Sequence, residues 1–535
     1  MMDNPQTKKP NNMKRTTIIA ALLATTMAAA AQETYDNARL ATQDLNGTAR
    51  YVGMGGAMDA LGADLSTIST NPAGIGLFRS SQVKLSMGIM GQEDAADFAD
   101  ASKSHVSFDQ AGFVYAKRTG RSSFFNFAFN YHKSTDFNQI LTAANRLKGA
   151  SQNKLTYAKY ENELINPYLN KYGELVADDN RFNQVDYLYA NAFMSSVSGN
   201  DFELYYNDAS DYSFGRKNSG YIGSYEINIS GNLNDRLYLG ATFGIDDVHY
   251  NSATAYSENL IDANGQSIGN VLLQDDRSIT GTGFNLKLGV IFRPVAESPL
   301  RIGVSVATPT WYKLKSTNYL TLLNSTSEGR YDSGDSQESF KFKLNTPWKF
   351  GLSMGTTIDN MVAIGAGYEY ADYPSTDTRI IEGDEYDWWT DSWYETSSSD
   401  KAMNIHTKRT LEGVHTIKLG AELRAADNIA VRLGYNYVSP MYKDSGVRNV
   451  DVNSPYAYYA STTDYTNWDA TNRITCGVGF TFERFTLDLG YQYSCQNGTF
   501  HPFADSQWKT GNLHADGVKV DNKRHQVVMT MGYRF

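Results

Sequence analysis

The residues of this sequence that could do chemistry do not gather into a catalytic pattern. No pair among the eight histidines has metal-ligand spacing on one strand face, and most lie at predicted strand ends or in loops: His105, His132, His249, His406, His415, His501, His514 and His525. No Ser-His-Asp set and no convergent pair of carboxylates stands out. The glycine cluster at 53–56 superficially resembles a dinucleotide-binding loop, but lacks the preceding strand and the third glycine. We therefore predict no enzyme activity, no metal site and no cofactor.

Composition favours a membrane protein built from strands. The chain has 535 residues and is rich in Tyr (36), Phe (25) and Gly (44), while its mean hydropathy is −0.45. A helical membrane protein needs runs of about 18 or more apolar residues, and none occurs. The net charge of −10 and the lack of a basic stripe exclude nucleic acid as a partner.

From Ser81 onward, segments of about ten residues alternate apolar and polar side chains. Such a period of two indicates strands with one apolar face. Lys287 and Leu288, like Arg432 and Leu433, should therefore point to opposite sides of the wall. Fourteen segments fit this pattern, near 81–91, 105–117, 123–133, 221–231, 237–249, 280–293, 299–308, 346–357, 361–372, 412–425, 428–439, 472–483, 485–495 and 524–535.

The connections between these segments alternate between short and long. Short ones lie at 119–121, 232–235, 358–360, 426–428 and 483–484, and the longest lies near 134–219. Short periplasmic turns and long extracellular loops produce this rhythm in outer-membrane barrels. The last segment closes on Phe535, which resembles the C-terminal signal read by the barrel-assembly machinery. We predict a 14-stranded antiparallel outer-membrane β-barrel over residues 81–535.

The N-terminus has the pattern of an export signal. Lys14 and Arg15 form a basic region, 18–27 is a short apolar stretch, and 29–31 supplies small residues before Gln32. We predict a signal peptide over 1–31 and localisation in the cell outer membrane.

Residues 32–80 are rich in Gly and Ala and are not strand-like. Since a barrel of this size is too wide for its own side chains to fill, we predict that they form a plug in the lumen. Inward charges of both signs could hold this plug, in part through its own Asp59 and Asp64. The predicted lumenal side chains are Lys84, Asn130, Glu226, Lys287, Lys349, Glu369, Lys418, Glu422, Arg432 and Asp488.

The segment 60–74 contains the element Asn71-Pro72-Ala73, followed by Gly74. It resembles the N-terminal hatch of the FadL/TodX family of outer-membrane transporters for hydrophobic compounds, and local matches occur at 368–373 and 415–422. Pro72 fixes one φ angle and Asn71 can bond its own backbone, so the element should form a rigid turn. That turn could take part in gating, or it could only stabilise the plug.

The resemblance implies that hydrophobic ligands are captured on the extracellular side and leave through a gap in the wall or past the hatch. In the longest loop, 141–147 and 155–164 have helix-like spacing. The side chains of Leu141, Leu155, Tyr187, Tyr189 and Phe193 could frame an apolar groove there, although ordinary loop packing would explain them equally well.

The alternation slips within the second strand. Val106 and Phe108 are even-numbered, whereas Phe113 and Tyr115 are odd-numbered. One inserted residue among Asp109, Gln110, Ala111 and Gly112 would explain the slip as a β-bulge. Members of the family have a kinked strand that opens the wall, but bulges are also common in barrels without such a role.

The resemblance implies a passive transporter for hydrophobic compounds such as long-chain fatty acids, with a fatty acid-like molecule and outer-membrane lipid as partners. An alternative is a PorV-like barrel that serves protein secretion and binds a protein partner through its loops. The aromatic stretch 387–394 would suit that role equally well. Some relatives carry a hemin receptor label, but the histidine spacing does not favour haem. Cys476 and Cys495 are expected to be free thiols, because the hairpin register separates them.

Overall fold

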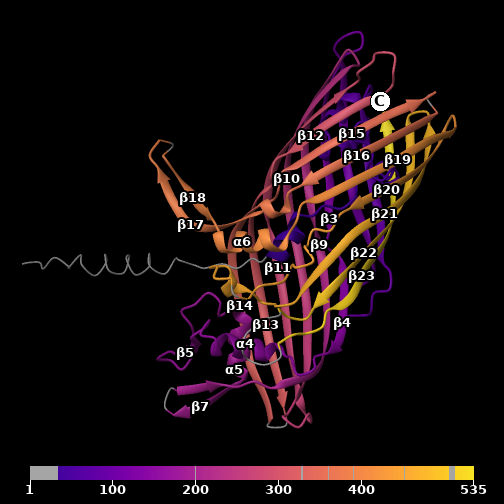
Figure 1. Cartoon of the computed structure of the whole chain (residues 1–535). Coiled ribbons are helices and arrows are strands. Elements are labelled where there is room, and N and C mark those ends of the chain that lie inside the picture. The colour runs from indigo at the N-terminus through magenta and orange to yellow at the C-terminus, as the bar shows by residue number, and fades with distance from the viewer. Residues whose placement is uncertain are drawn as a thin grey trace, which may run out of the picture.

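The computed structural model describes residues 34–198, 201–326, 329–359, 361–389, 391–450, 452–504 and 513–535, and the predicted signal peptide lies outside them. Fourteen antiparallel strands form a closed barrel, because β23 (Val518–Arg534) pairs with β1 (Gln82–Gln92) (Figure 1). The others, in order around the ring, are β2 (Ser104–Arg118), β3 (Phe124–Asp136), β9 (Asp208–Leu233), β10 (Leu237–Ile261), β11 (Ser267–Phe292), β12 (Arg301–Ala307), β15 (Lys349–Ile358), β16 (Val362–Ala371), β19 (Val414–Ala426), β20 (Ile429–Val438), β21 (Tyr465–Phe482) and β22 (Phe485–His501). The predicted fold class and all fourteen predicted strand positions are confirmed.

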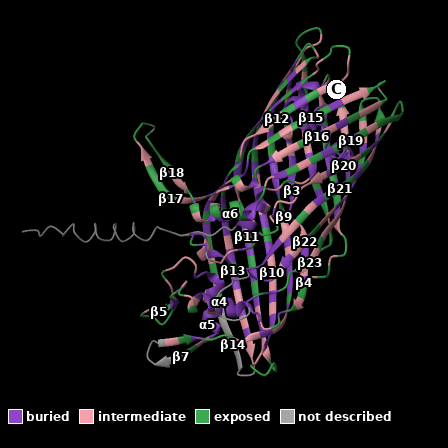
Figure 2. Ribbon diagram, in the orientation of Figure 1, coloured by how far each residue is buried: buried purple, intermediate pink, exposed green. Residues whose placement is uncertain are grey.

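The two faces of the wall differ as the alternation predicted. Leu288 and Leu433 are 47% and 64% exposed on the outside, while the neighbouring Lys287 and Arg432 are buried inside. Exposed and buried residues alternate along the strands in Figure 2. On β10 the outward apolar side chains end at Ile245, and the next outward residue is Asp247. The apolar belt thus ends part of the way along the strand, as expected where a barrel leaves the bilayer.

The wall continues beyond this belt at one end. Strands β9, β10 and β11 are longer than predicted, and β13 (Trp311–Thr326) and β14 (Gly329–Asn345) extend the same sheet. In the extension the pattern inverts, since Tyr250, Tyr256 and Leu260 of β10 are buried inside while Asn251 and Asn259 are exposed outside. The sequence prediction missed these extensions because it followed the lipid-facing pattern, which stops at the belt.

The long connections gather at this extended end, which we call the loop end, and the short turns lie at the opposite, turn end (Figure 1). Outer-membrane barrels place their short turns in the periplasm and their long loops outside the cell. The loops contain the helices α4 (Gln152–Glu161), α5 (Gln184–Ala192) and α6 (Lys401–Thr410), and the short 3-10 helices η3 (Tyr373–Ser375) and η4 (Ala457–Tyr459). They also contain the short strands β4 (Gln139–Arg146), β5 (Tyr168–Leu169), β6 (Leu175–Val176), β7 (Met194–Ser198), β8 (Asp201–Leu204), β17 (Asp377–Asp387) and β18 (Ser392–Ser399).

One helix prediction in the longest loop is wrong. Residues 141–147, which have helix-like spacing, lie largely in β4, which pairs with β9 from Gln139 to Arg146. Periodicity over so few residues cannot separate a buried strand from a helix, and here the free edge of the long strand β9 decides the outcome. The second predicted stretch, 155–164, overlaps α4.

The segment before β1 runs through the lumen. Its elements are α2 (Thr34–Ala41), α3 (Ala49–Gly53), η1 (Leu65–Ser69) and η2 (Pro72–Leu77), and we call residues 34–80 the hatch. At the loop end, the Oγ1 of Thr34 lies 2.8 Å from the Nδ1 of His406 in α6. Further along, α3 contacts β20 to β23, and η2 contacts β9, β10 and β11 across the barrel. The hatch therefore touches opposite sides of the wall. Within the described part of the chain, no helix is long and apolar enough to span a membrane.

Candidate functional site

Several ion pairs join the hatch to the barrel, and three of them connect its middle part to β1 and β19. Arg50 of α3 reaches Glu422 of β19 at 2.7 Å, Asp64 reaches Lys84 of β1 at 3.3 Å, and Asp59 reaches Lys418 of β19 at 3.1 Å. The sequence pointed to Asp59, Asp64 and the three wall residues, but not to Arg50, whose partner lies 372 positions away. Because an unpaired charge is costly to bury, these pairs favour a single position of the hatch over others.

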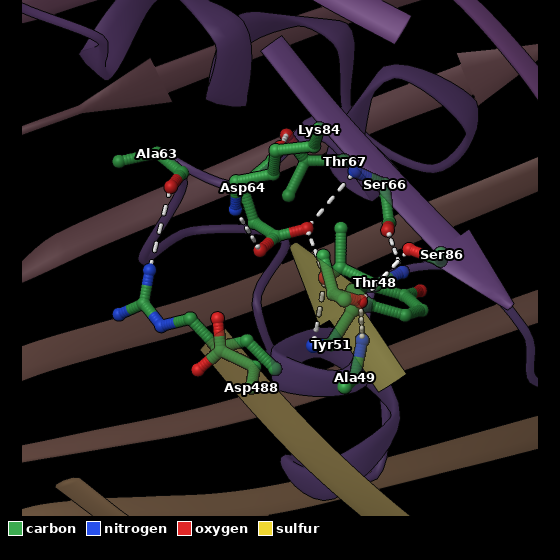
Figure 3. A network of polar contacts seen from close by, with 12 residues as sticks. Thr48, Ala49, Tyr51, Ala63, Asp64, Ser66, Thr67, Lys84, Ser86 and Asp488 are labelled. Atoms are coloured by element: carbon green, nitrogen blue, oxygen red, sulfur yellow. Dashed lines mark hydrogen bonds and ion pairs between the residues drawn. The ribbon is translucent and has the colours of Figure 1, made fainter. Parts of the chain in front are cut away.

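Asp64 is the centre of the polar contacts shown in Figure 3. Its Oδ1 accepts hydrogen bonds from the Thr48 hydroxyl at 2.8 Å and from the Ser66 amide at 3.0 Å. Burial alone would raise the pKa of this carboxyl, but Lys84, Arg50 and these hydrogen bonds outweigh burial and hold the pKa below its usual value. Asp64 is therefore a buried carboxylate that ties α3, η1 and the wall together.

The Asn71-Pro72-Ala73 element begins η2. Asn71 is the N-cap, its Oδ1 accepts the amide hydrogen of Ala73 at 3.2 Å, and Pro72 occupies the first turn. The carbonyl of Gly74 accepts a hydrogen bond from the Ala63 amide at 3.0 Å, which closes the hatch segment on itself. The element thus has the geometry of a capped rigid turn that packs on the wall.

Wall glycines let the hatch backbone approach the strands. A Cβ on Gly365 of β16 would lie 1.9 Å from the carbonyl oxygen of Ala57, and one on Gly434 of β20 would lie 2.2 Å from the amide nitrogen of Gly55. Inward glycines with hatch atoms at their Cβ position occur on nine strands that follow one another around the ring, and we call them the glycine band: Gly240, Gly289, Gly303, Gly355, Gly365, Gly420, Gly434, Gly477 and Gly490. The sequence analysis missed this band, because its period-two signal shows that a glycine faces inward but not what lies against it.

The wall is incomplete on one side at the level of the loop end. The register between β1 and β2 shifts at Asp109, since Ser86 lies opposite Gln110 while Met87 lies opposite Phe108. Pairing between β2 and β3 stops at Gln110 and His132, although both strands continue, and none is found over the described residues 104–109. The predicted bulge residues 109–112 thus lie where the two strands separate.

Side chains and a loop cover this break. His105 of β2 reaches Asp136 of β3 at 3.0 Å, and the Gln92 side chain exchanges two hydrogen bonds of 2.8 Å with the backbone of Ile140. Asp100, in the loop 93–103, pairs with Lys217 of β9 at 2.7 Å. The break is therefore closed by polar side chains, which can separate more readily than a backbone ladder.

Two neighbouring cavities lie behind the break. One, of about 290 Å³, lies in the lumen between the hatch and the wall, and the other, of about 200 Å³, lies beneath the loop 93–103. Gln139, Asn218 and Arg524 line both cavities. These three side chains lie between the lumenal cavity and the cavity at the covered break in the wall.

The lumenal cavity is lined by charges of both signs, with more cations than carboxylates. Asp36 of the hatch lies among arginines: burial would raise its pKa, but Arg277, Arg39, Arg448 and Arg216 outweigh burial and lower the pKa to about 2. Farther along the cavity, the buried Arg473 has one carboxylate nearby, that of Asp44 at 3.9 Å, and donates to the Asn436 side chain at 2.8 Å. Lys349 and Arg524 also line the cavity. The alternation around Ile474 could have marked Arg473 as inward-facing, although the sequence analysis did not select it.

The structure does not gather the residues of the predicted groove around an opening. Tyr189 and Phe193 belong to a closed core with Leu141, and Tyr187 is packed against that core. Leu155 is buried in α4. Of the five, Leu141 also lines the lumenal cavity, and none of the others lines either of the two cavities described above.

The fold and the hatch contacts define the class of this protein as a 14-stranded outer-membrane β-barrel with a polypeptide segment packed inside its lumen. The outer belt of apolar side chains and the closed ring are what a bilayer requires of a strand-built membrane protein. Among the residues that the structure describes, no group of three His, Cys, Asp or Glu side chains could hold a metal ion.

Comparison with known proteins gives similarity in structure alone. No family model and no curated protein matches the sequence. Among solved structures, the chain is similar to a Pseudomonas aeruginosa FadL homologue, with 12% identity over 92% of this chain and 99% of that one and a TM-score of 0.49. It is also similar to the Ralstonia pickettii toluene transporter TbuX, with 12% identity over the same shares and a TM-score of 0.46. Similarity at this level assigns neither a ligand nor a partner to this chain.

Proposed function

We propose that this protein is a passive outer-membrane transporter for hydrophobic compounds, with long-chain fatty acids as its ligands. The observation that supports the proposal is that the two cavities are adjacent, with Gln139, Asn218 and Arg524 in both linings, directly behind the break between β2 and β3. A molecule in the lumenal cavity would reach the side of the barrel by displacing these three side chains, without displacing the hatch. Lateral passage suits a hydrophobic ligand, because the ligand avoids a long aqueous route.

The cavity lining supports a ligand with an acidic head group. Arg473 and Lys349 supply cations, while Phe137, Leu141 and Trp468 supply apolar surface to the same cavity. Its volume of about 290 Å³ lies near the lower end of the range of ligand pockets, about 300 Å³. A carboxylate at Arg473 with an acyl chain along the apolar side would satisfy both kinds of lining.

In this proposal the hatch closes the turn end, and the Asn71-Pro72-Ala73 turn holds its position. The ion pairs and the glycine band hold the hatch against the wall. A ligand would therefore leave through the break in the wall more easily than past the hatch. The bulge at Asp109 contributes by separating β2 from β3. We expect insertion by the barrel-assembly machinery, as for other outer-membrane barrels.

The test compares ligands that differ only in the head group. We expect acyl chains in a lipid extract of the purified full-length protein, and tighter binding of a fatty acid than of the alcohol of equal length. Arg473→Gln should weaken fatty-acid binding about tenfold, since a hydrogen bond to a charged group contributes about 1.5–3 kcal/mol, and leave the alcohol unchanged. Arg79→Gln is the matched control, because Arg79 pairs with Asp235 away from either cavity.

If the purified protein carries a bound polypeptide in place of a lipid, a role in protein secretion would be favoured over transport. The exposed tryptophans of the β17–β18 hairpin are the observation that supports a PorV-like role with a protein partner. A polypeptide that co-purifies in stoichiometric amount, without an acyl chain, would contradict the transport proposal and support that role. Equal binding of acid and alcohol by the wild type would contradict the assignment of the head group to Arg473.

A further inference from the structure

The hairpin of β17 and β18 stands away from the rest of the molecule. It leaves the wall at the loop end, and Figure 1 shows its tip directed sideways and back toward the end of the barrel that carries the C-terminus. Three residues of β17, from Asp377 to Arg379, pair with β14, and beyond them β17 pairs with β18 alone. The outer part of the hairpin therefore has no partner strand in the described chain.

Two features of the base direct the hairpin outward. The β17–β18 register shifts between Ile381 and Gly383, and Gly383 has a φ of +137°, a bulge that bends the ribbon. Glu395 of β18 pairs with Lys313 at 2.7 Å and with Lys343 at 3.0 Å, and these lysines belong to β13 and β14 of the wall. The direction of the hairpin is thus set by contacts with the wall and by its own bulge.

The base of the hairpin lies next to the edge of the lipid-facing belt. Asp377 pairs with Asn345 of β14, which pairs with Trp311 of β13. Trp311 in turn packs on Phe284, which stands at the loop-end edge of the outward apolar run 284–292 of β11, with 5.2 Å between ring centroids. Aromatic rings at this position form the girdle that marks the water interface of an outer-membrane barrel. A hairpin that starts here and turns back toward the C-terminal end lies over the outer leaflet.

The tip of the hairpin is aromatic and fully exposed. Trp388, Trp389 and Trp393 are 86%, 97% and 70% exposed, and Tyr386 packs its ring edge-on against Trp388 and Trp393. Rings of this size left in water forgo a large hydrophobic gain. Trp and Tyr are the residues enriched where a protein meets lipid headgroups, since one part of the ring is apolar and the other can hydrogen-bond.

We propose that the aromatic tip of the β17–β18 hairpin docks into the headgroup region of the outer leaflet and anchors the loop end of the barrel on the lipid surface. The occupant is the lipid bilayer that already surrounds the barrel, so the contact extends the lipid-facing belt sideways. This proposal stands independently of the transported ligand.

The acidic residues of the hairpin fit a shallow contact. The hydroxyl of Tyr394 donates to the Glu385 carboxylate at 3.0 Å, and the hydroxyl of Tyr386 donates to Asp391. These carboxylates can stay in water while the indole rings enter the headgroup layer. A surface rich in uncompensated anionic lipid should repel them, so docking should be stronger on zwitterionic lipid.

Tryptophan quenching in vesicles tests the proposal. The full-length protein is inserted into phosphatidylcholine vesicles whose acyl chains are brominated either near the glycerol or near the methyl end. A variant with Trp388→Phe, Trp389→Phe and Trp393→Phe removes three of the five tryptophans that are exposed among the described residues but keeps aromatic rings at the tip. We expect the fluorescence quenched by the shallow bromines to fall by roughly half relative to wild type, with little change for the deep bromines.

Two further measurements make the outcome decisive. Trp468→Phe, at the lumenal cavity, should leave shallow quenching unchanged, and heat-modified migration on gels should confirm that both variants are folded. If the triple variant loses no shallow quenching, and iodide in the water quenches the tip tryptophans of the wild type freely, the tip does not dock in lipid and the proposal is wrong. A protein that co-purifies only with the intact tip would point to a protein partner and would likewise overturn it.

Discussion

The outer and inner faces of the barrel are made by the same strands but place different requirements on their side chains. Outside, Leu288 and Leu433 face lipid among other apolar side chains that are interchangeable in kind. Inside, their neighbours Lys287 and Arg432 each have a specific partner, Glu226 at 2.6 Å and Asp488 at 2.6 Å. Fluid lipid accepts any apolar surface, whereas a packed lumen requires each charge to be matched.

The outer face of the wall therefore specifies insertion into the membrane, and the inner face specifies the position of the hatch. Glu422 shows this most clearly, because it binds both Arg50 of the hatch and Arg432 of the wall, at 2.7 Å and 2.6 Å. Burial of Arg50 would lower its pKa, but Glu422, with support from Asp64 and Asp488, raises the pKa above its usual value, so this arginine stays charged. Changes on the two faces should therefore differ in kind as well as in size.

The largest effect should follow removal of the hatch. Deletion of residues 34–80 would take away the partners of the inner face and should convert a closed barrel into an open one, because the lumen is too wide to be filled by wall side chains. Single-channel conductance in planar bilayers measures this, with heat-modified migration as the check on folding. A folded deletion variant that conducts no more than wild type would show that the hatch is not the barrier.

A smaller effect is expected from Glu422→Gln. This change leaves the half-buried Arg50 without its carboxylate and the buried Arg432 with Asp488 alone, and should destabilise the hatch by about 3 kcal/mol. Protection of the hatch from added protease reports the loss. Combined with Arg50→Gln, the cost should be less than the sum of the two single changes, since the two side chains contact each other. Additive costs would show that the pair does not hold the hatch.

On the outer face, the size of the destabilisation should depend on the polarity of the new side chain. Leu433→Arg should cost about 2–4 kcal/mol if the residue lies near the bilayer midplane, whereas Leu433→Phe should be nearly neutral. Urea unfolding in lipid vesicles gives both values. Equal costs for the two substitutions would contradict the assignment of this face to lipid.

Replacing a glycine of the glycine band by alanine alters the wall and should displace the hatch backbone that packs against it. Gly365→Ala places a Cβ where the Ala57 carbonyl now lies and should cost about 1–3 kcal/mol as the hatch shifts. Gly231→Ala is the matched control, because the single atom near its Cβ position is a backbone oxygen at 3.9 Å. We expect brief conducting openings with Gly365→Ala and none with Gly231→Ala. Closed behaviour in both would mean that the hatch tolerates displacement.

The smallest effect should appear as a dependence on pH. The pKa of Asp36 is lowered from 3.8 to about 2 in the folded protein, so its contribution is fully present above pH 4 and is lost as the pH falls toward 2. The loss amounts to about 2 kcal/mol and should loosen α2 from the arginine cluster. Hydrogen exchange of α2, compared between pH 5 and pH 2.5, measures it. Asp36→Asn should show faster exchange at pH 5 and a weaker dependence on pH.

The barrel wall could be predicted from the alternation of apolar and polar residues alone. Alternation with a period of two follows directly from a strand with lipid on one side, so strand number, strand position and the facing of Leu288 and Lys287 were all predictable. The slip between Phe108 and Phe113 located the bulge for the same reason, because one extra residue exchanges the faces. The predicted separation of Cys476 and Cys495 also holds, since Cys476 lies opposite Tyr491 and both thiols are free.

The partners of the inward-facing side chains could be identified only from the folded structure. Arg50 and Glu422 lie 372 positions apart, and no local pattern can pair them, since the pairing depends on the path of the hatch through the closed ring. The same holds for the glycine band, for Arg473 in the cavity and for β4, whose helix-like residues became a strand because the edge of β9 was free. Every strand faces the same lipid, so every strand shows the same alternation of apolar and polar residues in the sequence. The hatch meets each strand through different residues, without a repeat, and its contacts are therefore fixed only when the chain has folded around it.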